Sequence, residues 1–145
     1  MALVLVPLPS RDFDPTEAAV PWAELKRRGH HVRFATPDGL AARADRRMIE
    51  GSGLGVWKPL LRANANGRAA YAMMVEDPDF KKPLNYQRAG EGVIDGLLLP
   101  GGHAPGMREY LESTAVQAMV ANAFERAIPV ALGLGSGLRN CVNIL

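Results

Sequence analysis

The sequence has a single cysteine, Cys141, among its 145 residues. One cysteine excludes an internal disulfide framework and fits a reducing compartment, so we expect a cytoplasmic protein. No apolar run reaches the length that spans a membrane. The apolar stretch at residues 2–9 is interrupted by Pro7 and Pro9 and has no basic leader, which favours a strand over a signal peptide.

Charge and aromatic residues are also sparse. Charged residues make up 22% of the chain, aromatic residues 6%, and the net charge is +2. The basic residues form small, separated groups with acidic neighbours, whereas a nucleic-acid surface requires a concentrated basic stripe with aromatic residues. We therefore expect no nucleic-acid partner and no membrane partner. The length and the 48% hydrophobic content indicate one globular domain, residues 1–145.

Apolar runs predict the strands. Residues 2–6 form a continuous apolar run, typical of a strand buried on both faces, and mostly apolar residues predict further buried strands over 93–99 and 128–132. Residues 31–36 predict one more strand, which the turn residues 37–39 (Pro-Asp-Gly) close.

Helix signals separate these strands. One helix is predicted to begin after the N-cap Asp14, with Pro15 at its first position, and to end at Gly29. A second is expected over about 66–76. The clearest helix is 114–126. Thr114 and Gln117 form a capping box at its start. Its apolar face is formed by Val116, Met119, Val120, Ala123 and Phe124.

Strands that alternate with helices predict an α/β fold, an open parallel sheet flanked by helices. Ligands bind to such sheets at the carboxyl ends of the strands. The candidate site residues are therefore those that follow Val6, Leu99 and Leu132.

The segment after Leu99 reads PGGHAPGMREYLES. Gly101 and Gly102 allow a sharp turn that points backbone N–H groups outward, as an oxyanion hole requires, although the same pair also suits a simple strand-to-helix turn. His103 adds a titratable group beside the turn, but a lone histidine is more often a hydrogen-bonded loop residue than a catalytic group.

Glu17 is the candidate after Val6. Pro21, four residues later, cannot donate to the Glu17 carbonyl, which predicts a kink that could aim the carboxylate inward. The alternative, which the residues alone favour, is that Glu17 only completes the helix cap and complements the helix dipole.

Taken together, FDPTEAAVPW, DGLLLPGGHAPGMREYLES and IPVAL occur in the order and spacing of the PfpI family. This family belongs to the class I glutamine amidotransferase-like superfamily, which includes the parkinsonism-associated deglycase. The chain resembles it over residues 2–132. The resemblance implies a flavodoxin-like sheet, a cysteine on a nucleophile elbow after residues 128–132, a hydrogen bond from that thiol to Glu17, and oxyanion donors near Gly101 and Gly102.

The resemblance also implies an activity on small carbonyl or amide substrates. Activities associated with the family are glutamine-amide hydrolysis, peptidase action, glyoxalase-type conversion of methylglyoxal to lactate, and deglycation. None of them requires a metal or an organic cofactor, so we expect no cofactor.

The chain departs from this pattern at the elbow. An ungapped alignment puts Leu134 at the place of the cysteine, and a shift of one residue puts Gly135 there. Ser136 lacks the flanking glycines of a G-x-S-x-G elbow, and Cys141 lies seven residues past Leu134, about 10 Å along a helix. We therefore expect a chain without its nucleophile and without activity.

Two other readings of the chain are excluded by its residues. GLGSGL resembles a dinucleotide fingerprint, but position 138, where that motif needs a third glycine, is leucine. His30 and His31 are adjacent and would point to opposite faces of a strand, which does not suit a metal site.

The tail 133–145 is too short for the helix and strands that follow the elbow in relatives. We expect a domain truncated after its fourth or fifth strand, through a reading-frame shift or an altered terminus. Uncovered apolar sheet predicts marginal folding and self-association. Two alternatives stay open: a pseudoenzyme that binds a partner through the 40–90 excursion, including Trp57 and Tyr71, and a chain without a selected function.

Overall fold

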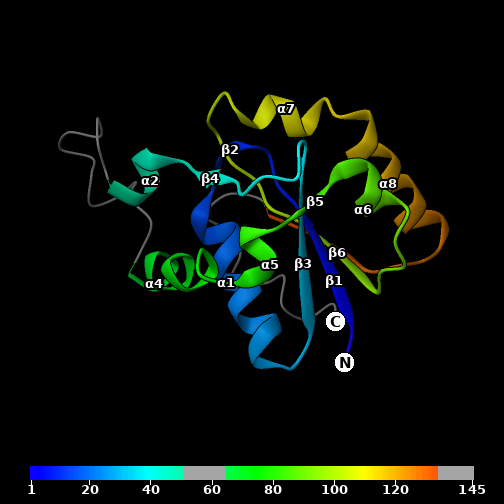
Figure 1. Ribbon diagram of the computed structural model, residues 1–145, viewed down its shortest axis with the longest axis horizontal. Coiled ribbons are helices and arrows are strands. Elements are labelled where there is room, and N and C mark those ends of the chain that lie inside the picture. The colour runs from blue at the N-terminus through cyan, green and yellow to red at the C-terminus, as the bar shows by residue number, and fades with distance from the viewer. Residues whose placement is uncertain (51–64, 134–145) are drawn as a thin grey trace.

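A computed structural model describes residues 1–50 and 65–133 of the chain. Within these ranges five parallel strands form one sheet in the order β5-β3-β1-β6-β7 (Figure 1). The strands are β1 (Leu3–Pro7), β3 (His31–Thr36), β5 (Leu84–Asn85), β6 (Gly96–Leu99) and β7 (Val130–Leu132). The predicted α/β fold with a parallel sheet is confirmed.

The strand register aligns the carboxyl ends of the strands at one edge of the sheet. Leu5 of β1 lies between Arg33 of β3 and Leu97 of β6. Leu99, the last residue of β6, pairs with Leu132, the last residue of β7. The segments that follow β1, β6 and β7 therefore leave the sheet at the same edge.

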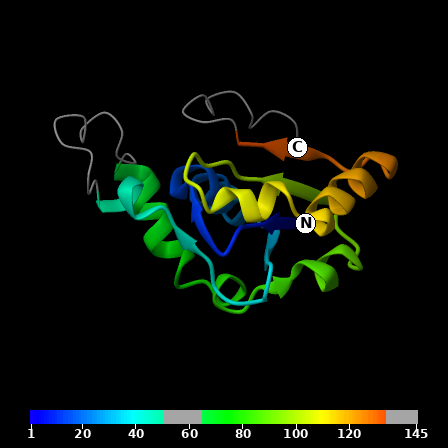
Figure 2. The same cartoon turned by 90° about the horizontal axis from the view of Figure 1, so that it is seen from above.

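Helices cover both faces of the sheet. In Figure 1, α1, α4 and α5 lie on one side of the strands and α6 and α8 on the other, while α7 lies over the carboxyl edge. Figure 2, from above, shows the same three layers with β7 (orange) at one end of the sheet. The helices are α1 (Pro15–Arg27), α2 (Arg46–Glu50), α4 (Ala65–Met74), α5 (Pro78–Lys81), α6 (Tyr86–Gly90), α7 (Met107–Leu111) and α8 (Thr114–Glu125).

The core between the sheet and α1 is built around aromatic side chains. Phe34 of β3 and Phe80 of α5 meet edge to face with their ring centroids 5.1 Å apart. Phe13 meets Tyr71 of α4 at 6.1 Å, and the Tyr71 hydroxyl accepts a hydrogen bond from the Ala44 N–H. Tyr71, a candidate partner-binding residue in the sequence, is therefore used in internal packing.

Three short strands were not predicted from the sequence. Besides β5, a second parallel sheet pairs β2 (Arg11–Phe13) with β4 (Arg43–Ala44). Strands of two or three residues carry no periodic signal, so only tertiary contacts define them.

Some predicted boundaries were wrong. The strand predicted over 93–99 begins at Gly96, and the Val93 side chain is exposed. The strand predicted over 128–132 begins at Val130. The N-cap of α8 is Ser113, not Thr114, because the Ser113 hydroxyl accepts from the Val116 N–H. Phe124, predicted on the apolar face of this helix, is exposed as well.

The last strand of the sheet, β7, is less buried than its neighbour β6. All four residues of β6 are buried, whereas Val130 and Ala131 of β7 are half-buried and Leu132 is exposed. Among the described residues β7 pairs only with β6.

No helix of the described ranges has the length and apolar content needed to cross a bilayer.

Candidate functional site

The segments that leave β1, β6 and β7 meet at Glu17. This residue lies in the first turn of α1 and is only 3% exposed. Its Oε2 accepts a hydrogen bond from the Gly101 N–H, at 2.7 Å. The structure thus brings together two predicted site residues that are 84 positions apart in the sequence.

The start of α1 fixes this geometry. The Asp14 carboxylate caps the helix by accepting from the N–H groups of Thr16 and Glu17, and Pro15 occupies the first helical position, where no N–H is needed. The Asp14 N–H donates to the Gly101 carbonyl at 2.9 Å. Glu17 therefore does not complete a capping box: the Asp14 N–H is bound to Gly101, and the Glu17 carboxylate binds the N–H of that same glycine.

Gly133, directly after β7, lies against the same carboxylate. Its N–H donates to the Leu99 carbonyl at 2.8 Å, which continues the β6–β7 ladder by one residue. A Cβ at this position would collide with Oε2 of Glu17, and one at Gly101 would lie 2.9 Å from the Gly133 carbonyl oxygen. The close approach of these three residues therefore requires glycine at both positions.

Two candidate positions for the nucleophile, Leu134 and Gly135, lie outside the described residues, as do Ser136, Cys141 and Trp57. What the structure does define is the residue just before them. Gly133, the last described residue after β7, lies against the Glu17 carboxylate.

The two predicted oxyanion donors differ. The Gly101 N–H is bound to Glu17. Gly102 is held between the Asp12 carbonyl oxygen and the Met107 side chain, and its N–H donates to no group within the described part of the chain. Within residues 1–50 and 65–133, Gly102 is therefore the member of the pair whose backbone donor has no acceptor.

His103, the third predicted site residue of this loop, is exposed. Its ring makes no hydrogen bond and no ion pair with the residues that the structure describes, Glu17 included. A catalytic role for His103 stays a prediction.

A groove of about 590 Å³ opens beside Gly101, Gly102 and Gly133, between the strand ends and helices α7 and α8. None of the described residues that line it carries a charge. Burial raises the pKa of the Tyr110 phenol, so this lining residue is neutral at neutral pH. The other lining residues are Leu99, Pro100, Met107, Leu111, Val116, Gln117, Val120, Ala121 and Leu132.

One contact at this edge was missed by the sequence analysis. Oδ2 of Asp12 accepts from the Gly106 N–H at 2.9 Å, which joins β2 to the residue before α7. The only sequence signal was the third glycine of PGGHAPG, which we assigned no role. In the described ranges, no group of three or more His, Cys, Asp or Glu side chains could hold a metal ion.

Comparisons with known proteins agree with this architecture. Residues 8–127 match the model of a family described as ThiJ/PfpI family-like. A curated relative, an uncharacterised protein of Schizosaccharomyces pombe, is 29% identical over 117 residues, which are 79% of this chain and 42% of the relative.

Solved structures resemble the chain in fold. An oxidized DJ-1 of Toxoplasma gondii has a TM-score of 0.60 at 21% identity, over 91% of this chain and 55% of that one. A DJ-1 superfamily protein of Agrobacterium tumefaciens has a TM-score of 0.54 at 20% identity, over 91% and 53%. These likenesses confirm the flavodoxin-like fold. The chain spans about half the length of the relatives it matches.

Proposed function

Because the chain belongs to the ThiJ/PfpI family, we propose that it keeps the carboxylate and amide half of a cysteine-dependent site and lacks the cysteine. One observation carries this proposal. The buried Glu17 carboxylate is fixed by the Gly101 N–H at the point where β7 delivers Gly133. The sequence after Gly133 has no sulfur until Cys141.

The retained groups can orient and polarise a substrate. A carboxylate in the place of Glu17 would hydrogen-bond a neighbouring thiol. The Gly102 N–H, which has no acceptor in the described part of the chain, can donate to a carbonyl oxygen that gains negative charge. The missing step is nucleophilic attack on the carbonyl carbon, which these family chemistries assign to a thiolate. The chain would therefore bind a substrate without turning it over.

The substrate class we propose is a small carbonyl or amide compound. The amide donor suits its carbonyl oxygen, and the neighbouring groove, whose described lining residues are all uncharged, suits an uncharged group attached to that carbonyl. The proposal requires no metal and no organic cofactor.

Turnover of methylglyoxal and of glutamine tests the loss of activity. We expect the chain, Glu17→Gln and the matched exposed-carboxylate control Glu24→Gln all to react at the rate of the protein-free blank. Turnover that Glu17→Gln abolishes and Glu24→Gln preserves would overturn the proposal.

Thiol reactivity gives an independent test. Iodoacetamide should label Cys141 at the rate of an unperturbed cysteine, and Glu17→Gln should not change that rate, because the proposal gives Cys141 no contact with the carboxylate. Labelling that is much faster than that of a cysteine peptide, and that Glu17→Gln slows, contradicts it.

A second candidate is a non-catalytic protein that acts by association, with itself first. The observation in favour is β7, a parallel strand with an exposed Leu132 and no second neighbour among the described residues. Sedimentation over a range of concentrations should show dimers or larger species; a monomer throughout contradicts this candidate. The single cysteine fits the cytoplasm as the compartment we propose.

A further inference from the structure

Asp12 has an unusual backbone. Its φ is +73°, in the left-handed region that few residues other than glycine adopt, although aspartate and asparagine tolerate it best. The pairing of β2 with β4 shifts register between Arg11 and Phe13, so Asp12 is the irregular residue of that ladder. Bulges of this kind redirect a side chain, and here the side chain points toward the loop after β6.

Asp12 contacts that loop at two places. Its Oδ2 accepts from the Gly106 N–H at 2.9 Å, and a Cβ on Gly106 would lie only 2.5 Å from the same oxygen. Its carbonyl oxygen lies against Gly102, where a Cβ would come within 2.9 Å. Both glycines are therefore needed for the loop to approach Asp12 this closely.

The other end of the loop is held by different residues. Gly101 donates to Glu17 and accepts from Asp14. Between the two anchors lies the N–H of Gly102, which has no partner among the residues that the structure describes. At the Gly106 end Asp12 supplies the hydrogen bond, and the Arg11 backbone lies close by, since a Cβ on Gly106 would come within 2.9 Å of the Arg11 carbonyl oxygen. A second tie, from the Ser10 N–H to Glu109 of α7, lies beyond Gly106 and does not touch the loop itself.

We infer that Asp12 is a positioning residue: its carboxylate and its left-handed backbone fix the 101–106 loop and set the direction of the Gly102 N–H. The role of that N–H as an oxyanion donor rests on the proposed function. The fixed loop geometry does not, because it follows from contacts within the chain.

Amide hydrogen exchange on glycine-labelled protein tests the inference with two variants. Asp12→Gly keeps the left-handed backbone but removes the carboxylate, and Asp12→Asn keeps both a side-chain acceptor and tolerance of the left-handed region. In Asp12→Gly we expect exchange at Gly106 to accelerate about tenfold or more, with shifted resonances of Gly101 and Gly102. In Asp12→Asn, exchange at Gly106 should stay close to that of the unaltered chain.

Asp45→Gly is the matched control, since the Asp45 carboxylate also accepts from a backbone N–H, that of Arg47, but lies at α2. It should leave the Gly101, Gly102 and Gly106 signals unchanged. Unchanged exchange at Gly106 in Asp12→Gly, or an Asp12→Asn variant that behaves like Asp12→Gly, would overturn the inference.

Should neither variant fold, the unaltered chain decides: a protected Gly106 amide supports the inference, and exchange at the rate of an unfolded peptide overturns it. None of these measurements uses turnover. An active chain would therefore refute the proposed function and leave this result standing.

Discussion

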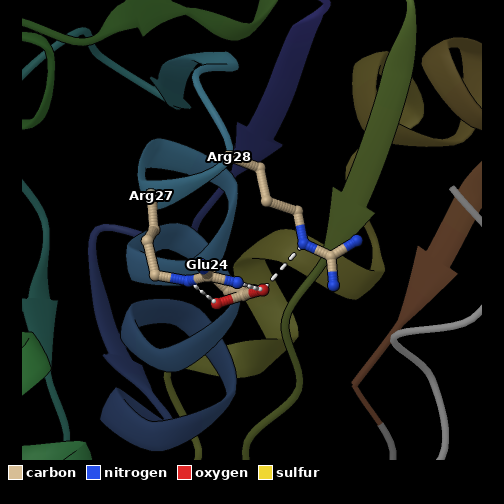
Figure 3. A network of polar contacts seen from close by, with 3 residues as sticks. All are labelled: Glu24, Arg27 and Arg28. Atoms are coloured by element: carbon tan, nitrogen blue, oxygen red, sulfur yellow. Dashed lines mark hydrogen bonds and ion pairs between the residues drawn. The ribbon is translucent and has the colours of Figure 1, made fainter.

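The two ends of α1 use the same chemistry in opposite surroundings. At its beginning, Asp14 and Glu17 are 8% and 3% exposed and accept hydrogen bonds from backbone N–H groups. At its end, Glu24 accepts hydrogen bonds from Arg27 and Arg28, at 2.7 Å each, with its side chain 31% exposed (Figure 3). The hydrogen bonds at the exposed end are short and join charged groups. We nevertheless expect those at the buried end to contribute more to the free energy of unfolding.

Electrostatics explain the difference. The hydrogen bonds from Arg27 and then Arg28 lower the pKa of Glu24 to about 2, so the carboxylate is charged at neutral pH. Water and salt screen such a network, and exposed ion pairs contribute little to stability. A buried N–H that loses its acceptor has no water to replace it, and the full desolvation cost remains.

The largest effect is expected from Gly101→Ala. The new Cβ would lie 2.5 Å from Oε2 of Glu17 and 2.9 Å from the Gly133 carbonyl oxygen, so α1 and the end of β7 would have to move apart. We expect a loss of about 3 kcal/mol in the free energy of unfolding, measured by urea denaturation. Gly92→Ala, whose Cβ would meet only the Ala89 carbonyl oxygen at 3.5 Å, is the control and should change it by less than about 0.5 kcal/mol. Equal losses in both variants would mean that the buried end of α1 is not tightly packed.

A smaller effect is expected from Asp14→Ala. The substitution removes the acceptor of the Thr16 and Glu17 N–H groups and should cost about 1–2 kcal/mol, measured in the same way. Asp14→Ser retains a capping oxygen and should recover most of that loss. A serine variant as unstable as the alanine variant would show that the charge of Asp14, rather than its cap, stabilises this end.

The smallest effect is expected from Glu24→Gln, and it should depend on pH. The folded-state pKa of Glu24, about 2, lies below the ordinary value of 4.5, so its contribution is complete above about pH 4.5 and is lost as the pH falls through 2. The unaltered chain should be slightly more stable than the variant at pH 6, and the two should converge toward pH 2. Stability curves that stay parallel over this window, or a difference that 1 M salt does not reduce, would contradict the account.

Local signals predicted the elements that have local causes. Asp14, Pro15 and Gly29 predicted both ends of α1, and Gly29 has the positive φ, +80°, that favours glycine after a helix. The runs at 2–6 and 31–36 predicted β1 and β3 to within one residue at each end. Ser113 was missed because adjacent serine and threonine both suit an N-cap, and only the hydrogen bond to Val116 distinguishes them.

The sequence predicted which residues belong to the candidate site, but not which of them contact one another. The motifs singled out Glu17, Gly101 and Gly102, yet the residues alone favoured a cap role for Glu17. The cap interpretation failed because the Asp14 N–H donates to the carbonyl oxygen of Gly101. Gly101 lies 87 positions further along the chain, and no local sequence pattern predicts a contact between residues so far apart. Asp12 was missed for the same reason, since its left-handed backbone follows from the register shift between β2 and β4.

By itself the sequence determined the alternation of strands and helices, the caps of α1 and the family, because apolar runs, turn residues and motifs act over a few neighbouring positions. Only the tertiary structure decided which N–H group each carboxylate binds, which glycines must lack a side chain and which end of α1 is buried. Those outcomes depend on the parallel register of β1, β6 and β7, which brings distant loops to one edge of the sheet. Water is excluded there, so a donor that lost its acceptor would destabilise the fold by its full desolvation cost.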